Sequence, residues 1–139
     1  MRKLSREVLF KMVFAYRYGI QSEEKQSFDE LFNTITEEFK IDKNDLDFDY
    51  IKTGYEDIKE NFKAYDDIIS KKVSRYNVNR IFNSDLIILN IALFEINELK
   101  TEPKIIISEA IKLAKKYSTE QSIKFVNGVL GSILKDKNE

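Results

Sequence analysis

The chain has 139 residues, of which 42% are hydrophobic, and its 10 Phe and 7 Tyr can supply the core of a single domain. One Pro and four Gly are too few for a β-sandwich or barrel with many turns, so the composition favours an all-α fold. The absence of Cys and His excludes disulfides, thiolate or imidazole metal sites and catalytic triads that need an imidazole base.

The net charge of −1 is unevenly distributed along the chain. Residues 1–20 contain five basic side chains and one acidic, whereas residues 21–60 contain five basic and thirteen acidic. A basic patch can bind phosphates in an acidic protein when the acids point elsewhere, so nucleic acid is not excluded as a partner. No apolar run reaches the roughly 18 residues of a membrane span, and the N-terminus lacks a signal-peptide core. We therefore expect a cytoplasmic protein that makes no membrane contact.

The first predicted helix has Ser5 as its N-cap and ends near Tyr18, where Gly19 supplies a left-handed stop. This helix is apolar on two sides, because Phe10, Phe14 and Tyr18 form a second stripe opposite the main one. Two interpretations stay open. The helix is either buried at the centre of a bundle or carries a partly exposed aromatic row beside basic residues.

The next helix is predicted to open with a capping box, in which Ser27 pairs with Glu30. The linker IDKNDLD at residues 41–47 then leads to apolar residues at regular spacings of 3 and 4, beginning at Phe48. The helical pattern extends beyond an expected break near Asn61.

From Ser84, a predicted N-cap, the run LIILNIALFEINEL is apolar at almost every position and predicts a helix at the centre of the C-terminal half. Pro103 is expected at the start of the following helix, and Ser118 or Thr119 is expected to cap the last one. The helix after Pro103 is expected to turn four residues inward: Ile107, Ala110, Ile111 and Ala114. In total, about seven helices and no strand are predicted.

The segment SIKFVNGVLG, residues 122–131, keeps Lys124 and Phe125 off its apolar face, which covers an arc of roughly 140°. Gly128 and Gly131 lie on the polar side, where each costs roughly 1 kcal/mol against Ala. Either a second helix covers Phe125, or an exposed aromatic beside a cation stacks on and neutralises an unpaired nucleotide. Because no phosphate loop, dinucleotide fingerprint or zinc motif is present, we predict a binding protein and no enzyme.

Four segments resemble the NusB family of bacterial transcription antitermination factors in order and spacing: SREVLFKMVFAY (5–16), ILNIALFEI (88–96), EPKIIISEAIKLAKKYS (102–118) and IKFVNGVL (123–130). Residues 20–80 match the family only in helical pattern. The resemblance implies an all-α fold of two small packed helical bundles. We expect these as subdomains at roughly residues 1–80 and 81–139 of a single domain, 1–139.

The resemblance also implies a function and partners. Members of the family bind a short single-stranded RNA element called boxA, and they do so best as a heterodimer with NusE, a small-subunit ribosomal protein. The complex helps RNA polymerase read through terminators, notably on ribosomal RNA operons. We therefore expect boxA RNA, NusE and the RNA polymerase antitermination complex as partners, and no cofactor or metal.

Carried over by position, the family's RNA contacts fall at both ends of the chain. The resemblance implies that Arg2, Lys3 and Arg6 contact RNA phosphates or bases from the opening arm. It implies further that Lys124 supplies a charge and Phe125 a stacking face.

Two more positions follow from the resemblance, together with three departures from it. Gln121 lies where the family often has an acid close to the RNA, and Asp85 occupies an acidic position associated with the NusE contact. Asn90 replaces a common Arg, Ile123 a common His and Gly131 a common acid. The opening arm also has fewer Arg residues than is usual in the family. We expect this arm and the lost His and Arg side chains to weaken RNA binding and to make the partner protein more necessary.

Three alternatives remain. A helical adaptor that binds only protein would lack salt-dependent RNA binding. An RNA-modifying enzyme can carry a NusB-like domain before a nucleotide-binding α/β domain, which we do not expect here, because the chain ends at Glu139 with no glycine-rich loop. Some members of the family pair as homodimers that cover the RNA surface, and a homodimer stays open for this chain.

Overall fold

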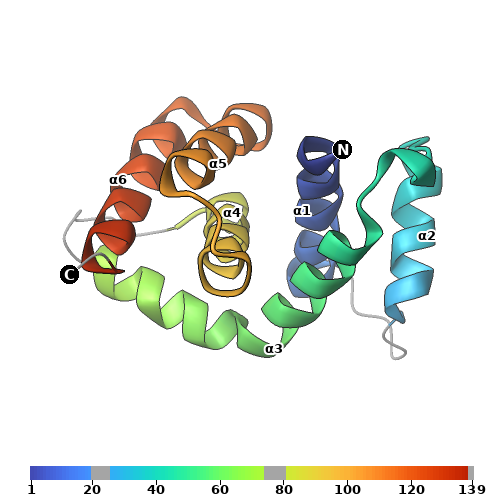
Figure 1. Cartoon of the computed structure of the whole chain (residues 1–139), viewed down its shortest axis with the longest axis horizontal. Coiled ribbons are helices and arrows are strands. Elements are labelled where there is room, and N and C mark those ends of the chain that lie inside the picture. Colours follow the sequence, from blue (N-terminus) through green and yellow to red (C-terminus); the bar gives the residue numbers. More distant parts are fainter. Residues whose placement is uncertain (20–25, 74–80, 138–139) are drawn as a thin grey trace. The chain divides into compact units, whose positions relative to one another are not determined.

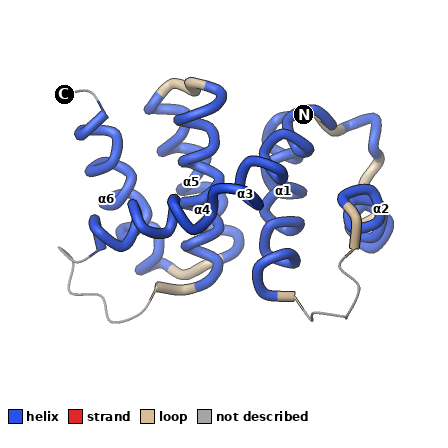
Figure 2. The backbone as a smooth tube through the Cα atoms, turned by 90° about the horizontal axis from the view of Figure 1, so that it is seen from below, coloured by secondary structure: helices blue, strands red, loops and turns tan. Residues whose placement is uncertain are grey.

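The computed structural model describes residues 1–19, 26–73 and 81–137, and all the regular structure in these ranges is helical (Figures 1 and 2). The all-α prediction is confirmed, with six α-helices in the described ranges where about seven helices were expected. A 3₁₀ turn at Lys43–Asp45 and a π-helical segment at Glu95–Leu99 add to them. The six helices are α1 (Arg2–Tyr18), α2 (Phe28–Glu38), α3 (Phe48–Val73), α4 (Asn83–Phe94), α5 (Pro103–Tyr117) and α6 (Glu120–Lys137).

The chain forms two compact units, Met1–Glu60 and Asn61–Glu139, whose boundary lies inside α3. The expected break near Asn61 is wrong, because α3 continues through this residue. One Asn in a helix interior costs less than about 1 kcal/mol, and buried residues at helical spacing continue on both sides of it. The buried residues of α3 nearest to Asn61 are Ile58 and Tyr65.

In the first unit, α1 begins at Arg2 rather than after Ser5, so the predicted N-cap is wrong. Ser5 is buried inside the helix, where its hydroxyl donates to the Met1 carbonyl at 2.8 Å and accepts the Asp47 amide at 2.8 Å. The left-handed stop at Gly19 is also wrong, since its φ is −70°. A Cβ at this glycine would lie 2.4 Å from the Ala15 carbonyl oxygen, so steric crowding explains the glycine.

The second apolar stripe of α1 is buried at one end and exposed in the middle. Phe10 is buried, Phe14 is exposed and Tyr18 is half-buried. Their rings follow one another along the helix, with centroids 6.1 Å and 5.4 Å apart. Each of the two open interpretations of this helix therefore describes a part of the stripe.

Aromatic rings from α2 and α3 pack together in the first unit. The Phe28 ring lies 5.7 Å from that of Phe32, 5.6 Å from that of Phe48 and 5.5 Å from that of Tyr55, within the range of favourable aromatic pairs. Burial, and then the nearby Tyr16, raise the pKa of Tyr55, so this phenol stays neutral at physiological pH.

The Ser27 half of the predicted capping box is confirmed, because the Glu30 amide donates to the Ser27 hydroxyl at 3.2 Å. Ser27→Ala removes this acceptor and is expected to lower the free energy of unfolding by about 1 kcal/mol. Urea denaturation followed by circular dichroism measures the change. Ser70→Ala, at an exposed position inside α3, is the control and should change stability little. Equal stability of the two variants would contradict the cap's contribution.

In the second unit, α4 is the buried centre, as predicted. Every residue from Ile87 to Phe94 is buried, and α5 and α6 both pack on this helix and on each other. The helix begins at Asn83 without a side-chain cap, so the predicted cap at Ser84 is wrong. The Ser84 hydroxyl instead lies 3.2 Å from the Ser118 hydroxyl.

The starts of the last two helices agree with the predictions. Pro103 is the first residue of α5, and the Thr119 hydroxyl caps α6 by accepting the Ser122 amide at 3.1 Å. The inward face of α5 is rotated from the predicted one, so that Ile107 and Ile111 are only half-buried. Its buried residues are Ile106, Ala110, Leu113 and Ala114. Among the described residues, no helix is both long and apolar enough to cross a membrane.

Candidate nucleic-acid interface

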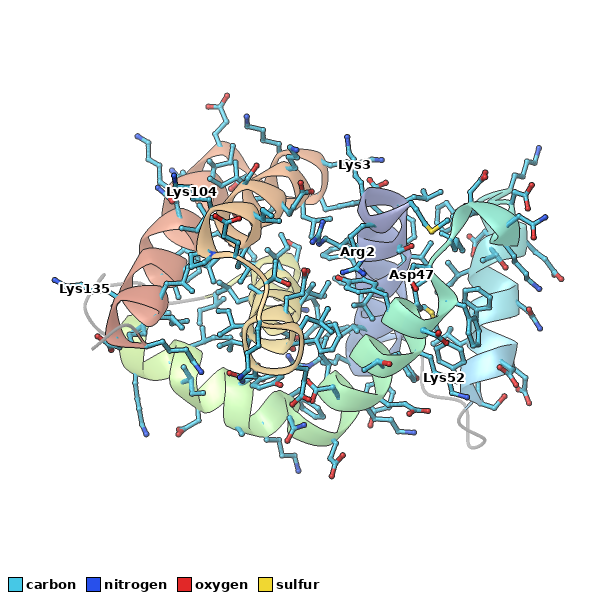
Figure 3. All side chains as sticks on the ribbon, in the orientation of Figure 1. Arg2, Lys3, Asp47, Lys52, Lys104 and Lys135 are labelled. Atoms are coloured by element: carbon cyan, nitrogen blue, oxygen red, sulfur yellow. The ribbon has the colours of Figure 1, made fainter. Side chains whose placement is uncertain are left out.

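The first turn of α1 presents Arg2 and Lys3 at the surface of the first unit (Figure 3). Lys3 is exposed, whereas Arg2 is held by two neighbours from one segment. The Arg2 guanidinium donates to the Asp47 carboxylate at 3.2 Å, and its central carbon lies 4.3 Å from the centroid of the Tyr50 ring. Asp47 also accepts the Tyr50 amide at 3.1 Å and so caps the start of α3.

Arg6, the third predicted RNA contact of the arm, is only 6% exposed. The residue therefore lies mostly inside the first unit, and its contact with RNA stays a prediction. The exposed cationic side chains of the first turn are therefore Arg2 and Lys3.

The start of α6 presents the other three predicted RNA residues at the surface of the second unit. Gln121 and Lys124 are exposed, and Phe125 is half-buried. The Phe125 side chain is therefore partly covered and partly accessible. This lies between the two interpretations of the sequence, a ring covered by a second helix and an exposed ring that stacks on a nucleotide. All three side chains lie within one and a half turns of one helix, as their spacing predicts.

The end of α5 adds cations that were not predicted as part of a site. Lys115 and Lys116 are exposed in the last turn of α5, and the Lys116 ammonium lies 5.6 Å from the centroid of the Tyr117 ring. Ser118 and Thr119 connect this turn to α6, so the two lysines come close in sequence to Lys124. The signal available in the sequence was the pair of lysines separated by one residue from Ser118, one of the two predicted caps.

Asp85 is 2% exposed, and its carboxylate contacts the connection between α5 and α6. The Ser118 hydroxyl donates to one carboxylate oxygen at 2.6 Å, and the Ser122 hydroxyl donates to the other at 2.8 Å. Contact of Asp85 with NusE stays a prediction. In this conformation its oxygens are engaged by the chain itself.

The three departures from the family pattern have different surroundings. Asn90 is fully buried and donates to the Asp66 carboxylate at 3.0 Å, so it belongs to the interior. Ile123 is half-buried. Gly131 is exposed, and a Cβ there would meet no atom within 4 Å, so close packing inside the chain does not explain this glycine.

The predicted RNA residues thus form two groups, one in each unit: Arg2, Lys3 and Arg6 in the first, and Gln121, Lys124 and Phe125 in the second. Within the described ranges, no group of three or more acidic, His or Cys side chains could bind a metal ion. The first group supplies cations, and the second supplies a cation and a partly accessible phenyl ring. Cations attract phosphates, and an accessible phenyl face can stack on a base.

Residues 3–135 match the NusB family. This chain is a member of that family. The transcription antitermination protein NusB of Clostridium perfringens (strain 13) is 40% identical over 136 residues, which cover 97% of this chain and 97% of that protein. NusB of Staphylococcus haemolyticus is 35% identical over 132 residues, covering 95% and 98%. The NusB family consists of transcription antitermination factors and not enzymes, and this chain is one of those factors.

Two solved structures are similar to this NusB family member. T. maritima NusB superposes with a TM-score of 0.71 at 29% identity, covering 97% of this chain and 91% of that one. A chain in the structure described as "Crystal Structure of a Plectonemic RNA Supercoil" superposes with a TM-score of 0.80 at 27% identity, covering 98% and 95%. The family fold therefore extends over nearly the whole chain.

Proposed function

We propose that this NusB family member promotes transcriptional read-through by binding single-stranded boxA-type RNA together with NusE. The complex would act within the RNA polymerase antitermination complex, notably on ribosomal RNA operons. The observation that carries the proposal is that exposed Lys124 and half-buried Phe125 are neighbours in sequence near the start of α6. The similarity to a chain in an RNA crystal structure supports it. Because bacterial transcription takes place in the cytoplasm, we propose that location.

In the second unit, Lys124 would neutralise a phosphate, Phe125 would stack on a base and Gln121 would donate or accept hydrogen bonds. Lys115 and Lys116, at the end of α5, would add phosphate contacts beside them. An exposed lysine that contacts a phosphate releases a counterion, so its contribution depends on salt.

In the first unit, Arg2 and Lys3 would supply the remaining predicted contacts. We propose that Arg6, which is buried, supports this arm from inside, and that Asp85 remains a position near the NusE contact. Two alternatives are outcomes of the tests below. A protein-binding adaptor would not bind RNA in the presence of NusE, and a homodimer that covers these residues would release RNA as protein concentration rises.

Fluorescence anisotropy of a labelled boxA-type RNA, measured with this protein alone and with NusE at two salt concentrations, tests the proposal. We expect NusE to tighten RNA binding. We expect added salt to loosen it, because phosphate contacts dominate the affinity. An anisotropy that does not change even with NusE at low salt would overturn RNA binding and favour the adaptor.

Replacing Lys124 should change the salt dependence as well as the affinity. For Lys124→Gln we expect the slope of log affinity against log salt to become shallower by about 0.7, the value for one phosphate contact on a single strand. Lys135→Gln is the matched control, since Lys135 is an exposed lysine near the other end of the same helix. Equal slopes for the two variants would place Lys124 outside the phosphate contacts.

A further inference from the structure

A polar cluster lies where the start of α4 meets the connection between α5 and α6. Asp85, in the first turn of α4, accepts hydrogen bonds from Ser118 at the end of α5 and from Ser122 in the first turn of α6. The two hydroxyls also lie 2.7 Å apart. Thr119 contributes a second contact to α6, because its hydroxyl lies 3.0 Å from that of Ser122. We call Asp85, Ser118, Thr119 and Ser122 the Asp85 cluster.

The contacts of the Asp85 cluster are those that a buried carboxylate requires. A charge removed from water is costly unless hydrogen bonds satisfy it, and hydroxyl donors to carboxylates form short bonds of about 2.5–2.7 Å. The Ser118 bond, at 2.6 Å, lies in that range, and the Ser122 bond, at 2.8 Å, is slightly longer. Because each carboxylate oxygen binds a different helix end, Asp85 fixes the positions of both ends relative to α4.

The cluster acts on the start of α6, the part of the helix that carries the proposed RNA contacts. Ser122 is buried, whereas Gln121 and Lys124, which flank it in sequence, are exposed. Since successive residues of a helix are about 100° apart, fixing the inward direction of Ser122 also fixes the directions of Lys124 and Phe125. The exposed side chains Gln121 and Lys124 contribute little packing of their own, so the cluster and the Thr119 cap hold this end of α6 together with buried Val126.

We propose that Asp85, Ser118 and Ser122 are positioning residues, which hold the first turn of α6 so that Gln121, Lys124 and Phe125 face the RNA together. The inference rests on the proposed function and extends it to residues that do not touch the ligand. Preorganised contacts avoid the ordering cost of binding, so loss of the cluster weakens RNA binding even when the fold remains.

Ser122→Ala removes one hydroxyl from the cluster, and Ser118→Ala, at a half-buried position, removes the other with less effect on packing. Ser108→Ala, at an exposed position of α5, is the matched control. With boxA-type RNA and NusE, we expect about 5-fold weaker binding for each cluster variant, the effect of one lost hydrogen bond, and no change for the control. Hydrogen exchange of amides 120–125 should become faster in both cluster variants without global unfolding.

A double-mutant cycle separates positioning from a general loss of stability. If Ser122 orients Lys124, then Lys124→Gln costs less affinity in the Ser122→Ala background than in the wild type. If the two changes add, or if both cluster variants bind RNA as the wild type does, the inference is overturned and the proposed function stands. If the wild type does not bind RNA with NusE, the proposed function falls and the inference falls with it.

Discussion

Phe94→Ala is expected to lower the free energy of unfolding by about 3–5 kcal/mol, the range for truncating a fully buried Phe. Phe94 is 0% exposed and ends α4, the helix on which α5 and α6 pack. The substitution removes apolar surface from the core and leaves a cavity that the surrounding helices can fill only in part. Urea denaturation followed by circular dichroism measures the loss.

Phe82→Ala is the matched control, because it is the same change at the other end of α4. Phe82 is 49% exposed and is the N-cap residue, a position where its side chain makes no capping hydrogen bond. We expect a change within about 0.5 kcal/mol, as for most surface substitutions. Similar losses for the two variants would contradict the assignment of α4 as the buried centre.

Phe125→Ala is expected to weaken RNA binding by about 1–3 kcal/mol, the range for losing one base stacked on an aromatic ring. At 25 °C this loss corresponds to a dissociation constant about 5-fold to 150-fold higher. Phe125→Leu distinguishes stacking from packing, because leucine retains apolar volume in the half-buried site but has no aromatic face. Anisotropy with boxA-type RNA and NusE measures both variants.

The two variants at Phe125 have different implications. If Phe125→Leu binds RNA as weakly as Phe125→Ala while unfolding at a urea concentration close to the wild type, the ring stacks on a base. If Phe125→Leu binds like the wild type, the residue supports the site only by packing. Phe39→Leu, at an exposed aromatic position in the first unit, is the control and should leave RNA affinity unchanged.

The elements that could be predicted from the sequence are those with a local physical cause. Pro103 starts a helix because its ring fixes φ and its missing amide hydrogen is not needed there. Ser27 and Thr119 cap helices through an amide three residues later. The apolar run of α4 is buried because it has no polar face to expose.

The predictions that failed depended on partners distant in sequence or on local crowding. Serine is a residue type that often caps helices, but the Ser5 hydroxyl accepts a hydrogen bond from the amide of Asp47, which lies 42 residues later. Glycine often ends helices in the left-handed conformation, but here a residue without a Cβ is required because position 19 lies close to the Ala15 carbonyl. The first contact is too distant in sequence for a local pattern to show it, and residue type alone does not distinguish a glycine required by crowding from one required by a positive φ.

The same limit applies to the candidate site. Helical periodicity placed Lys124 outside the core, and its exposure agrees with that prediction. The resemblance assigned partner contacts to Asp85 and Arg6, but both residues are buried, although charged side chains usually lie at the surface. The serines that accommodate the Asp85 carboxylate lie 33 and 37 residues away, and their hydroxyls have no sequence signature of this role.

The ion pair between Arg2 and Asp47 has a consequence for how RNA binding responds to salt. Arg2 is already neutralised by a carboxylate of its own chain, so a phosphate that binds there replaces one anion by another. Such an exchange releases fewer counterions than binding to a free cation, and added salt weakens the competing internal pair as well. The salt dependence of RNA affinity should therefore indicate fewer phosphate contacts than a structure of the complex would contain. In Asp47→Asn, which removes the competing carboxylate, the number of phosphate contacts indicated by the salt dependence should come closer to the number in the complex.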